Sequence, residues 1–232
     1  MATNAAAANG SDMSASRPVR RNGVAVWDRP LYGVGIGTEG LDPREHAVTT
    51  VAVYSPTASI VLDDHDERRL IDQLFDWLHD QPPGIVTTWN GANFDGPFLD
   101  HRSLVLPPRP WRRAWRRRCP ANIELRPDRA IAPKYEPLPS YGPNGYQIRW
   151  CGIHSHVDVA CLFRSWAGSN GVPWSLKPGA RAFGLRPVEV DRTQVAELPA
   201  ADRMVCNLSD ATVTYRLAEQ AATLGLADHN GG

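Results

Sequence analysis

The chain has 232 residues, in which 25 basic residues balance 25 acidic ones, so net charge points to no class of partner. Hydrophobic residues make up 42% of the chain, which excludes a wholly disordered protein and is enough for one large domain. No apolar run approaches the roughly 18 residues of a membrane helix, and residues 1–21 lack the apolar stretch of a signal peptide. We therefore expect a cytoplasmic protein without a membrane partner, whose four cysteines are reduced because they form no C-x-x-C pair.

The first part of the ordered chain predicts a β-meander followed by a helix. Short β-rich runs, split by Pro, Gly and Ser, occupy Val24–Trp27, Leu31–Ile36, Val48–Tyr54 and Ser59–Leu62. From Asp66 the stretch DERRLIDQLFDWLHD carries an apolar stripe and acids in its first turn, which predicts a helix. Gly84–Trp89 is then typical of a buried strand. A strand after a crossover helix predicts at least one parallel pair.

The second part begins with a segment of no clean period. His101–Gln147 is rich in Pro and Arg, and we expect it to be a long surface insertion. Regular structure returns at Ile148–Phe163, where a strand turns into a helix, and helices are expected over Ser175–Phe183 and Ala200–Leu224. These elements predict one mixed α/β domain over residues 22–226, with disordered tails at 1–21 and 227–232.

A glycine pattern near the start of the domain imitates a dinucleotide site. Residues 35–40 read Gly-Ile-Gly-Thr-Glu-Gly and fit G-x-G-x-x-G directly after a predicted strand. Such a site needs a helix that opens at the third glycine, so that its N-terminus faces a pyrophosphate. Pro43 follows at once and Val48–Tyr54 alternates like a strand. The required helix is missing, so we do not expect a dinucleotide site.

The strongest local motif is Thr87–Leu99, which reads TTWNGANFDGPFL. A buried strand ends in a polar Asn-Gly turn, and Phe94-Asp95 then starts a helix. This arrangement exposes Asp95 at the carboxyl end of a sheet, where the sites of α/β proteins usually lie. An Asp at this point can equally serve as an N-cap of the helix. The segment by itself leaves both roles open.

The motif resembles the second motif of the DEDD-type 3′–5′ exonucleases, a ribonuclease-H-like superfamily that includes polymerase proofreading domains. The resemblance extends from about Leu31 to Ala222 and is closest to stand-alone relatives of the exonuclease of family B DNA polymerases. It implies an α/β fold with a mixed five-stranded sheet, its first three strands antiparallel, flanked by helices. It places the remaining motifs at Tyr32–Leu41, His156–Val159, Ser175–Lys177 and Ser209–Ala211.

The resemblance also implies which residues act. The family uses four carboxylates to hold two divalent ions, Mg²⁺ or Mn²⁺, about 4 Å apart. Asp95 and Asp210 match as catalytic residues and metal ligands, and Asp158 is a further candidate ligand or a structural residue. Asn90 and Phe94 match as substrate-binding residues.

Two of the four carboxylates are absent. The first-motif Asp and Glu positions hold Gly35 and Gly37, and Cys206 stands where the third motif usually has a Tyr. A set of two carboxylates cannot form the usual two-metal clamp. Substitute ligands would have to come from the nearby acids Asp28, Glu39, Asp42 and Glu45.

A basic run follows the second motif. Between His101 and Arg118 there are seven arginines and no acid, and Trp111 and Trp115 are interleaved with them. Arg binds phosphate bidentately and Trp stacks on unpaired bases. We therefore expect Arg112, Arg113, Trp115 and Arg116 to contact single-stranded nucleic acid, DNA rather than RNA. The alternative is a solvated basic face.

Two functional hypotheses remain at this point. One is an exonuclease-like protein that binds nucleic acid or a partner protein and is catalytically impaired. The other is an active metal-dependent exonuclease on single-stranded DNA, with a role in DNA repair, that uses Asp95, Asp210 and substitute ligands. His154 and His156, two apart on a strand, lack further ligands at matching spacing, so we expect core or surface histidines rather than a metal site.

Overall fold

The computed structural model describes residues 18–21, 24–106, 123–127, 146–190 and 198–226. Its centre is a mixed five-stranded sheet with the order β5-β4-β3-β6-β9. The strands β3 (Leu31–Thr38), β4 (Val48–Tyr54) and β5 (Ser59–Asp63) form an antiparallel meander. The strands β6 (Ile85–Thr88) and β9 (Ser155–Asp158) run parallel to β3. The predicted ribonuclease-H-like α/β class, with its first three strands antiparallel, is confirmed.

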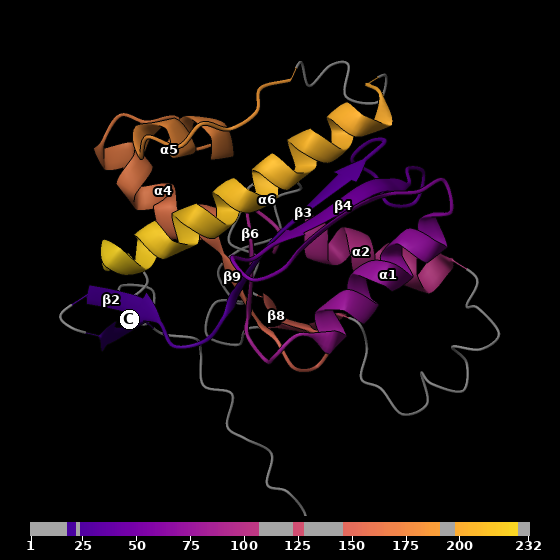
Figure 1. Cartoon of the computed structure of the whole chain (residues 1–232), viewed down its shortest axis with the longest axis horizontal. Coiled ribbons are helices and arrows are strands. Elements are labelled where there is room, and N and C mark those ends of the chain that lie inside the picture. Colours follow the sequence, from indigo (N-terminus) through magenta and orange to yellow (C-terminus); the bar gives the residue numbers. More distant parts are fainter. Residues whose placement is uncertain (1–17, 22–23, 107–122, 128–145, 191–197, 227–232) are drawn as a thin grey trace, which may run out of the picture.

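Helices cover both faces of this sheet (Figure 1). On one face, α1 (Glu67–Asp80) packs on β4, and α2 (Asp95–Val105) lies beside α1. On the other face the long helix α6 (Ala200–Thr223) crosses β3 and β4, with α4 (Val159–Ser169) and α5 (Leu176–Ala182) packed against it. The sheet therefore separates two apolar cores, one under α1 and α2 and one under α4–α6.

The two faces of β3 carry very different side chains. Tyr32 and Val34 point into the core under α1, as the period of two in a strand requires. The other face carries Gly33, which has no side chain to separate β3 from α6. A Cβ atom on Gly33 would lie 2.2 Å from the carbonyl oxygen of Ala211 and 2.8 Å from the Cβ of Tyr215. The helix backbone therefore rests almost directly on the strand.

Two short β-ribbons differ from the predicted organisation. Pro18–Arg21, expected in the disordered tail, forms β1 and pairs with β2 (Val24–Trp27), so β2 belongs to this ribbon and not to the main meander. The ribbon is anchored because the indole Nε1 of Trp27 donates to the carbonyl of Ala218 in α6 at 2.8 Å. A sequence scan cannot find such a contact, which joins segments far apart in the chain.

The second ribbon lies in the predicted insertion 101–147. The start of that segment, through Val105, completes α2, and β7 (Ile123–Pro127) pairs with β8 (Tyr146–Trp150). Ile123 and Ile148 are buried in the core under α1, which gives the ribbon an apolar side despite its polar composition. The insertion is therefore tied to the domain at both of its ends.

Replacing Gly33 by Ala should destabilise the protein by at least about 2 kcal/mol, because the new methyl group collides with the backbone of α6. The matched control is Gly168→Ala near the end of α4, where a Cβ would meet nothing within 4 Å. That change should stabilise the fold by roughly 0.5–1 kcal/mol through helix propensity. Chemical denaturation of both variants tests the pair, and equal stability of the two would contradict the close packing of α6 on β3.

Candidate functional site

A cavity of about 460 Å³ opens between β3, the end of β6, and the helices α2, α5 and α6. Its walls come from four chain segments that lie far apart in the sequence. The polar and motif residues in these walls include Gly35, Asn90, Phe94, Asp95, Asn207 and Asp210. The carboxyl end of β6 supplies one wall, as expected for an α/β sheet.

The turn after β6 is held by a network of buried hydrogen bonds. Asn90 adopts a left-handed conformation with φ of 63°, which Asn tolerates better than most residues. The carboxylate of Asp158 accepts from the backbone N–H groups of Asn90 (2.9 Å) and Ala92 (3.0 Å). It also accepts from Ala160 at 3.1 Å and so caps α4. One side chain therefore joins the end of β9 to the turn that presents Asp95.

Asp95 is the first residue of α2, and only 7% of its surface is exposed. Burial raises the pKa of its carboxyl to about 7, although a backbone hydrogen bond from Ile36 lowers the pKa. The nearby Asp158 raises it further. The side chain thus lies against the main chain of β3, beside Gly35, and in the absence of a bound cation it is partly protonated near neutral pH.

The opposite wall is one face of α6. Asn207, Asp210 and Thr214 line the cavity at helical spacings of three and four residues. Behind them the buried ammonium of Lys177 donates to the carbonyl of Val188 at 2.5 Å and lies 4.0 Å from Oδ1 of Asp210. This lysine places a fixed positive charge beside the third-motif carboxylate.

Gly35 and Gly37 bring no acid to the site, and other side chains occupy the space next to their Cα atoms. Gly35 lines the cavity, and a Cβ on it would lie 2.8 Å from Oδ1 of Asn207. A Cβ on Gly37 would lie 2.3 Å from the hydroxyl of Thr50. Asn207 and Thr50 are themselves joined, because the Asn207 amide donates to Thr50 Oγ1 at 3.1 Å. Asn207 and Thr50 therefore fill the space in which side chains at positions 35 and 37 would begin.

The structure brings four of the predicted site residues together and separates one. Asn90, Phe94, Asp95 and Asp210 all line the cavity. Asp158 does not line it, because its two oxygens are turned to backbone amides. The sequence allowed a further ligand or a structural residue at this position, and these backbone hydrogen bonds favour the structural role. The predicted contacts Arg112, Arg113, Trp115 and Arg116 lie outside the described residues.

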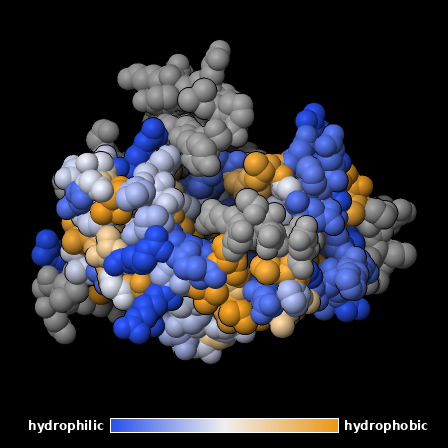
Figure 2. Space-filling model, turned by 90° about the horizontal axis from the view of Figure 1, so that it is seen from above, coloured by the Kyte–Doolittle hydropathy of each residue, from blue (hydrophilic) through white to orange (hydrophobic). Residues whose placement is uncertain are grey.

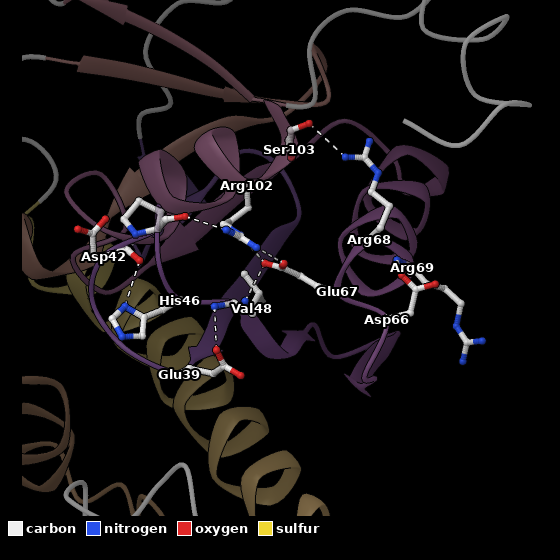
Figure 3. A network of polar contacts seen from close by, with 12 residues as sticks. Glu39, Asp42, His46, Val48, Asp66, Glu67, Arg68, Arg69, Arg102 and Ser103 are labelled. Atoms are coloured by element: carbon white, nitrogen blue, oxygen red, sulfur yellow. Dashed lines mark hydrogen bonds and ion pairs between the residues drawn. The ribbon is translucent and has the colours of Figure 1, made fainter. Parts of the chain in front are cut away.

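None of the acids considered as substitute ligands lines the cavity. Figure 3 shows that Glu39 and Asp42 belong to the connection between β3 and β4, where they bind Ala47 and His46 of the same loop. Asp42 is also held by Arg44. Asp28 faces Arg29 at 3.5 Å, and Glu45 is exposed. Within the described part of the chain, no group of three His, Cys, Asp or Glu side chains is arranged to hold a metal ion.

The two histidines that the sequence assigned to the core or the surface both contact the central sheet. His154 is buried; it accepts from the backbone of Gly84, and its Nε2 donates to the carbonyl of Leu78 at 2.7 Å. His156 is half-buried and lies 2.8 Å from the hydroxyl of Thr88, and desolvation lowers its pKa to about 3.

Sequence reasoning did not assign a role to four residues of the cavity wall, namely Trp89, Trp174, Asn207 and Thr214. Trp89 lies within the Thr87–Leu99 motif, and Trp174 precedes the predicted helix start at Ser175, so both could have been found from the motifs. Asn207 stands three residues before Asp210, a helical spacing that places both on one face. Nothing in the sequence indicates that Asn207 meets Gly35, because the two residues are far apart in the chain.

Comparison with known proteins agrees with this geometry. Residues 41–117 match the model of the exonuclease domain of DNA polymerase family B. A stretch of 45 residues is also 38% identical to the catalytic subunit of DNA polymerase epsilon from Eremothecium gossypii, and it covers 19% of this chain and 2% of the polymerase subunit. The matched stretch thus corresponds to a small fraction of that relative.

The extent of the family match is informative about the site. It includes the second motif with Asp95 and begins after Gly35 and Gly37. The family generally uses divalent metals. Among the described residues, no helix is both long and apolar enough to cross a bilayer.

Removing the charge of Asp95 should stabilise the metal-free protein. The folded-state pKa of Asp95, about 7, lies above the value of about 4 expected in the unfolded chain. Its contribution to stability is therefore fully present below pH 4 and is lost as pH rises through 7. In chelator, Asp95→Asn should exceed wild type by up to about 4 kcal/mol at pH 8 and by little at pH 4, measured by chemical denaturation.

The same change at Asp158 should stabilise the metal-free protein far less at pH 8 than Asp95→Asn does, because burial raises the pKa of Asp158 only to about 6 and its carboxylate accepts three backbone hydrogen bonds. Asp158→Asn replaces one acceptor oxygen by an NH₂ group that faces a backbone N–H, which should cost about 2 kcal/mol. This variant is the matched control, since both changes remove one buried carboxylate. If Asp95→Asn instead destabilises the protein at pH 8 in chelator, the folded protein favours the ionised form of Asp95, which would contradict the raised pKa.

Proposed function

We propose that the protein is a 3′–5′ exonuclease-like domain that binds single-stranded nucleic acid and is catalytically impaired. One observation carries the proposal: Gly35, which the sequence resemblance aligns with a first-motif carboxylate, lies in the wall of the same cavity as Asp95 and Asp210. Two-metal catalysis depends on a clamp of acids around both ions. The residues present do not fit that cluster, so no hydrolytic step is assigned to them.

The remaining lining suits an unpaired nucleotide. Trp89, Phe94 and Trp174 supply aromatic surface in the cavity, and a base can stack on such rings with little dependence on its identity. The polar side chains of Asn90 and Asn207 offer hydrogen-bonding groups beside them. We propose DNA rather than RNA as the ligand, because the matched family model belongs to DNA polymerases.

Figure 2 shows hydrophilic and apolar residues intermixed on the face seen from above. The basic run at Arg112, Arg113 and Arg116 adds positive charge to the chain directly after α2, the helix that begins at Asp95. We also propose a reducing cytoplasmic setting, which the lack of any C-x-x-C pair among the four cysteines of the sequence supports.

The purified full chain should not digest single-stranded DNA in the presence of Mg²⁺ or Mn²⁺. The physical reason is the missing pair of first-motif acids, whose ligation the two-metal reaction needs. Gel analysis of a 5′-labelled oligonucleotide measures this directly. Digestion that disappears in Asp95→Ala would overturn the proposed impairment and establish the alternative, an active exonuclease with substitute ligands.

Binding to the same oligonucleotide should be salt-sensitive and independent of metal. Each phosphate contact should contribute roughly −0.7 to the slope of log affinity against log salt concentration. Replacing Arg112, Arg113, Arg116 and Arg117 by Ser should weaken binding and flatten this slope. The matched control replaces four exposed arginines elsewhere, namely Arg20, Arg44, Arg181 and Arg216. Equal effects of the two sets would mean that the basic run is only a solvated face.

A further inference from the structure

Trp174 connects the cavity to the outer surface of α4. It belongs to the cavity wall and is half-buried. Its indole Nε1 donates to the carbonyl of Ala160 in α4 at 2.7 Å, which fixes the orientation of the ring. Arg164 follows Ala160 by one helical turn, and its guanidinium lies over the indole, 4.9 Å from the ring centre. One helix therefore anchors the ring and also places a positive charge against it.

Arg164 is exposed and is not part of the cavity wall. Its positive charge consequently lies outside the cavity, beside the ring that forms the wall. A guanidinium that lies over an aromatic ring makes this contact with its flat face, whereas it binds phosphate with the N–H groups along its edge. The contact with Trp174 and the binding of a phosphate are therefore compatible at Arg164.

The cavity wall itself is unfavourable for a phosphate group. Among the described residues, its ionisable side chains are the acids Asp95 and Asp210, and Lys177, which lies 4.0 Å from Asp210, is not part of the wall. A nucleobase is uncharged and can stack on aromatic rings, whereas a phosphodiester is repelled by carboxylates. The wall therefore favours a base inside the cavity and its phosphate outside, on the side where a positive charge lies.

We propose that a single strand of DNA leaves the cavity over α4, with one base stacked on Trp174 and the adjacent phosphate bound by Arg164. This strand path rests on the proposed function, because both use the same cavity and the same ligand. It adds a phosphate contact on α4 that is separate from the basic run at Arg112, Arg113 and Arg116. The path assigns no catalytic step to any residue.

Binding of a fluorescein-labelled single-stranded oligonucleotide to the full chain in chelator, measured by anisotropy at several salt concentrations, tests this path. Arg164→Gln should weaken binding and make the slope of log affinity against log salt concentration less steep by roughly 0.7, the value of one phosphate contact. Arg164→Lys should keep the slope of wild type, because lysine retains the charge. Trp174→Leu should weaken binding about tenfold, because it removes a surface on which a base stacks.

The matched control is Arg69→Gln, which removes an exposed arginine from α1 on the other face of the sheet and should change neither affinity nor slope. Arg164 is exposed as well, so its variants should keep the melting temperature of wild type. Equal slopes for wild type and Arg164→Gln would overturn the strand path, as would equal losses in Arg164→Gln and Arg69→Gln. A wild type that does not bind the oligonucleotide refutes the proposed function and the path together, whereas binding that Arg164→Gln leaves unchanged refutes the path alone.

Discussion

The close approach of α6 to β3 is the constraint on which the site depends. Gly33 lets the backbone of the helix rest on the strand, since a single Cβ there would meet the carbonyl of Ala211 at 2.2 Å. One turn earlier along the helix, the same approach brings Asn207 over Gly35. Asn207 and Asp210 therefore lie close to β3 in the cavity wall. Larger side chains at the glycine positions of β3 would hold α6, and with it these two residues, further from the strand. Stability and site geometry are set by the same glycines.

A second constraint holds the other side of the cavity. The turn after β6 has a left-handed Asn90, and it keeps its shape because Asp158, at the end of the neighbouring parallel strand, accepts from the turn's backbone amides. Asp95 gains a fixed position at the start of α2 from this support. Its burial raises its pKa, so its negative charge is costly unless a cation or a proton accompanies it. A buried and poorly neutralised carboxylate is typical of a binding site rather than of a structural N-cap.

The strands and helices that have a clear periodic pattern of apolar residues could be predicted from the sequence. Alternation in Val48–Tyr54 and the apolar stripe of α1 place these elements closely, because each pattern reflects the geometry of its own element. The ribbons β1–β2 and β7–β8 were not predicted, since they are stabilised by long-range contacts such as that of Trp27 with Ala218. Local patterns contain no information about such partners.

The site divides in the same way. Asp95, Asn90 and Phe94 belong to one contiguous motif, so the sequence indicates them together. The role of Asp158 could not be read from the sequence, because an acid at the end of a strand can either bind a metal ion or accept hydrogen bonds from the backbone of a turn. Asn207 could not be found at all without its distance to Gly35. The loss of the first-motif acids is visible in the sequence, whereas the side chains that fill their space are visible only in the packing of α6.

The number of divalent ions that one chain binds at saturation is the most direct test of the proposed impairment, because a chain without the first-motif acids should not hold the two ions of the family's metal clamp. Mn²⁺ bound to the full chain can be counted by electron paramagnetic resonance of the free ion during a titration, with and without a single-stranded oligonucleotide. We predict fewer than two ions per chain in both conditions. Two ions per chain, with the second lost in Asp95→Asn, would contradict this prediction and show that the chain assembles a two-metal centre without acids at Gly35 and Gly37.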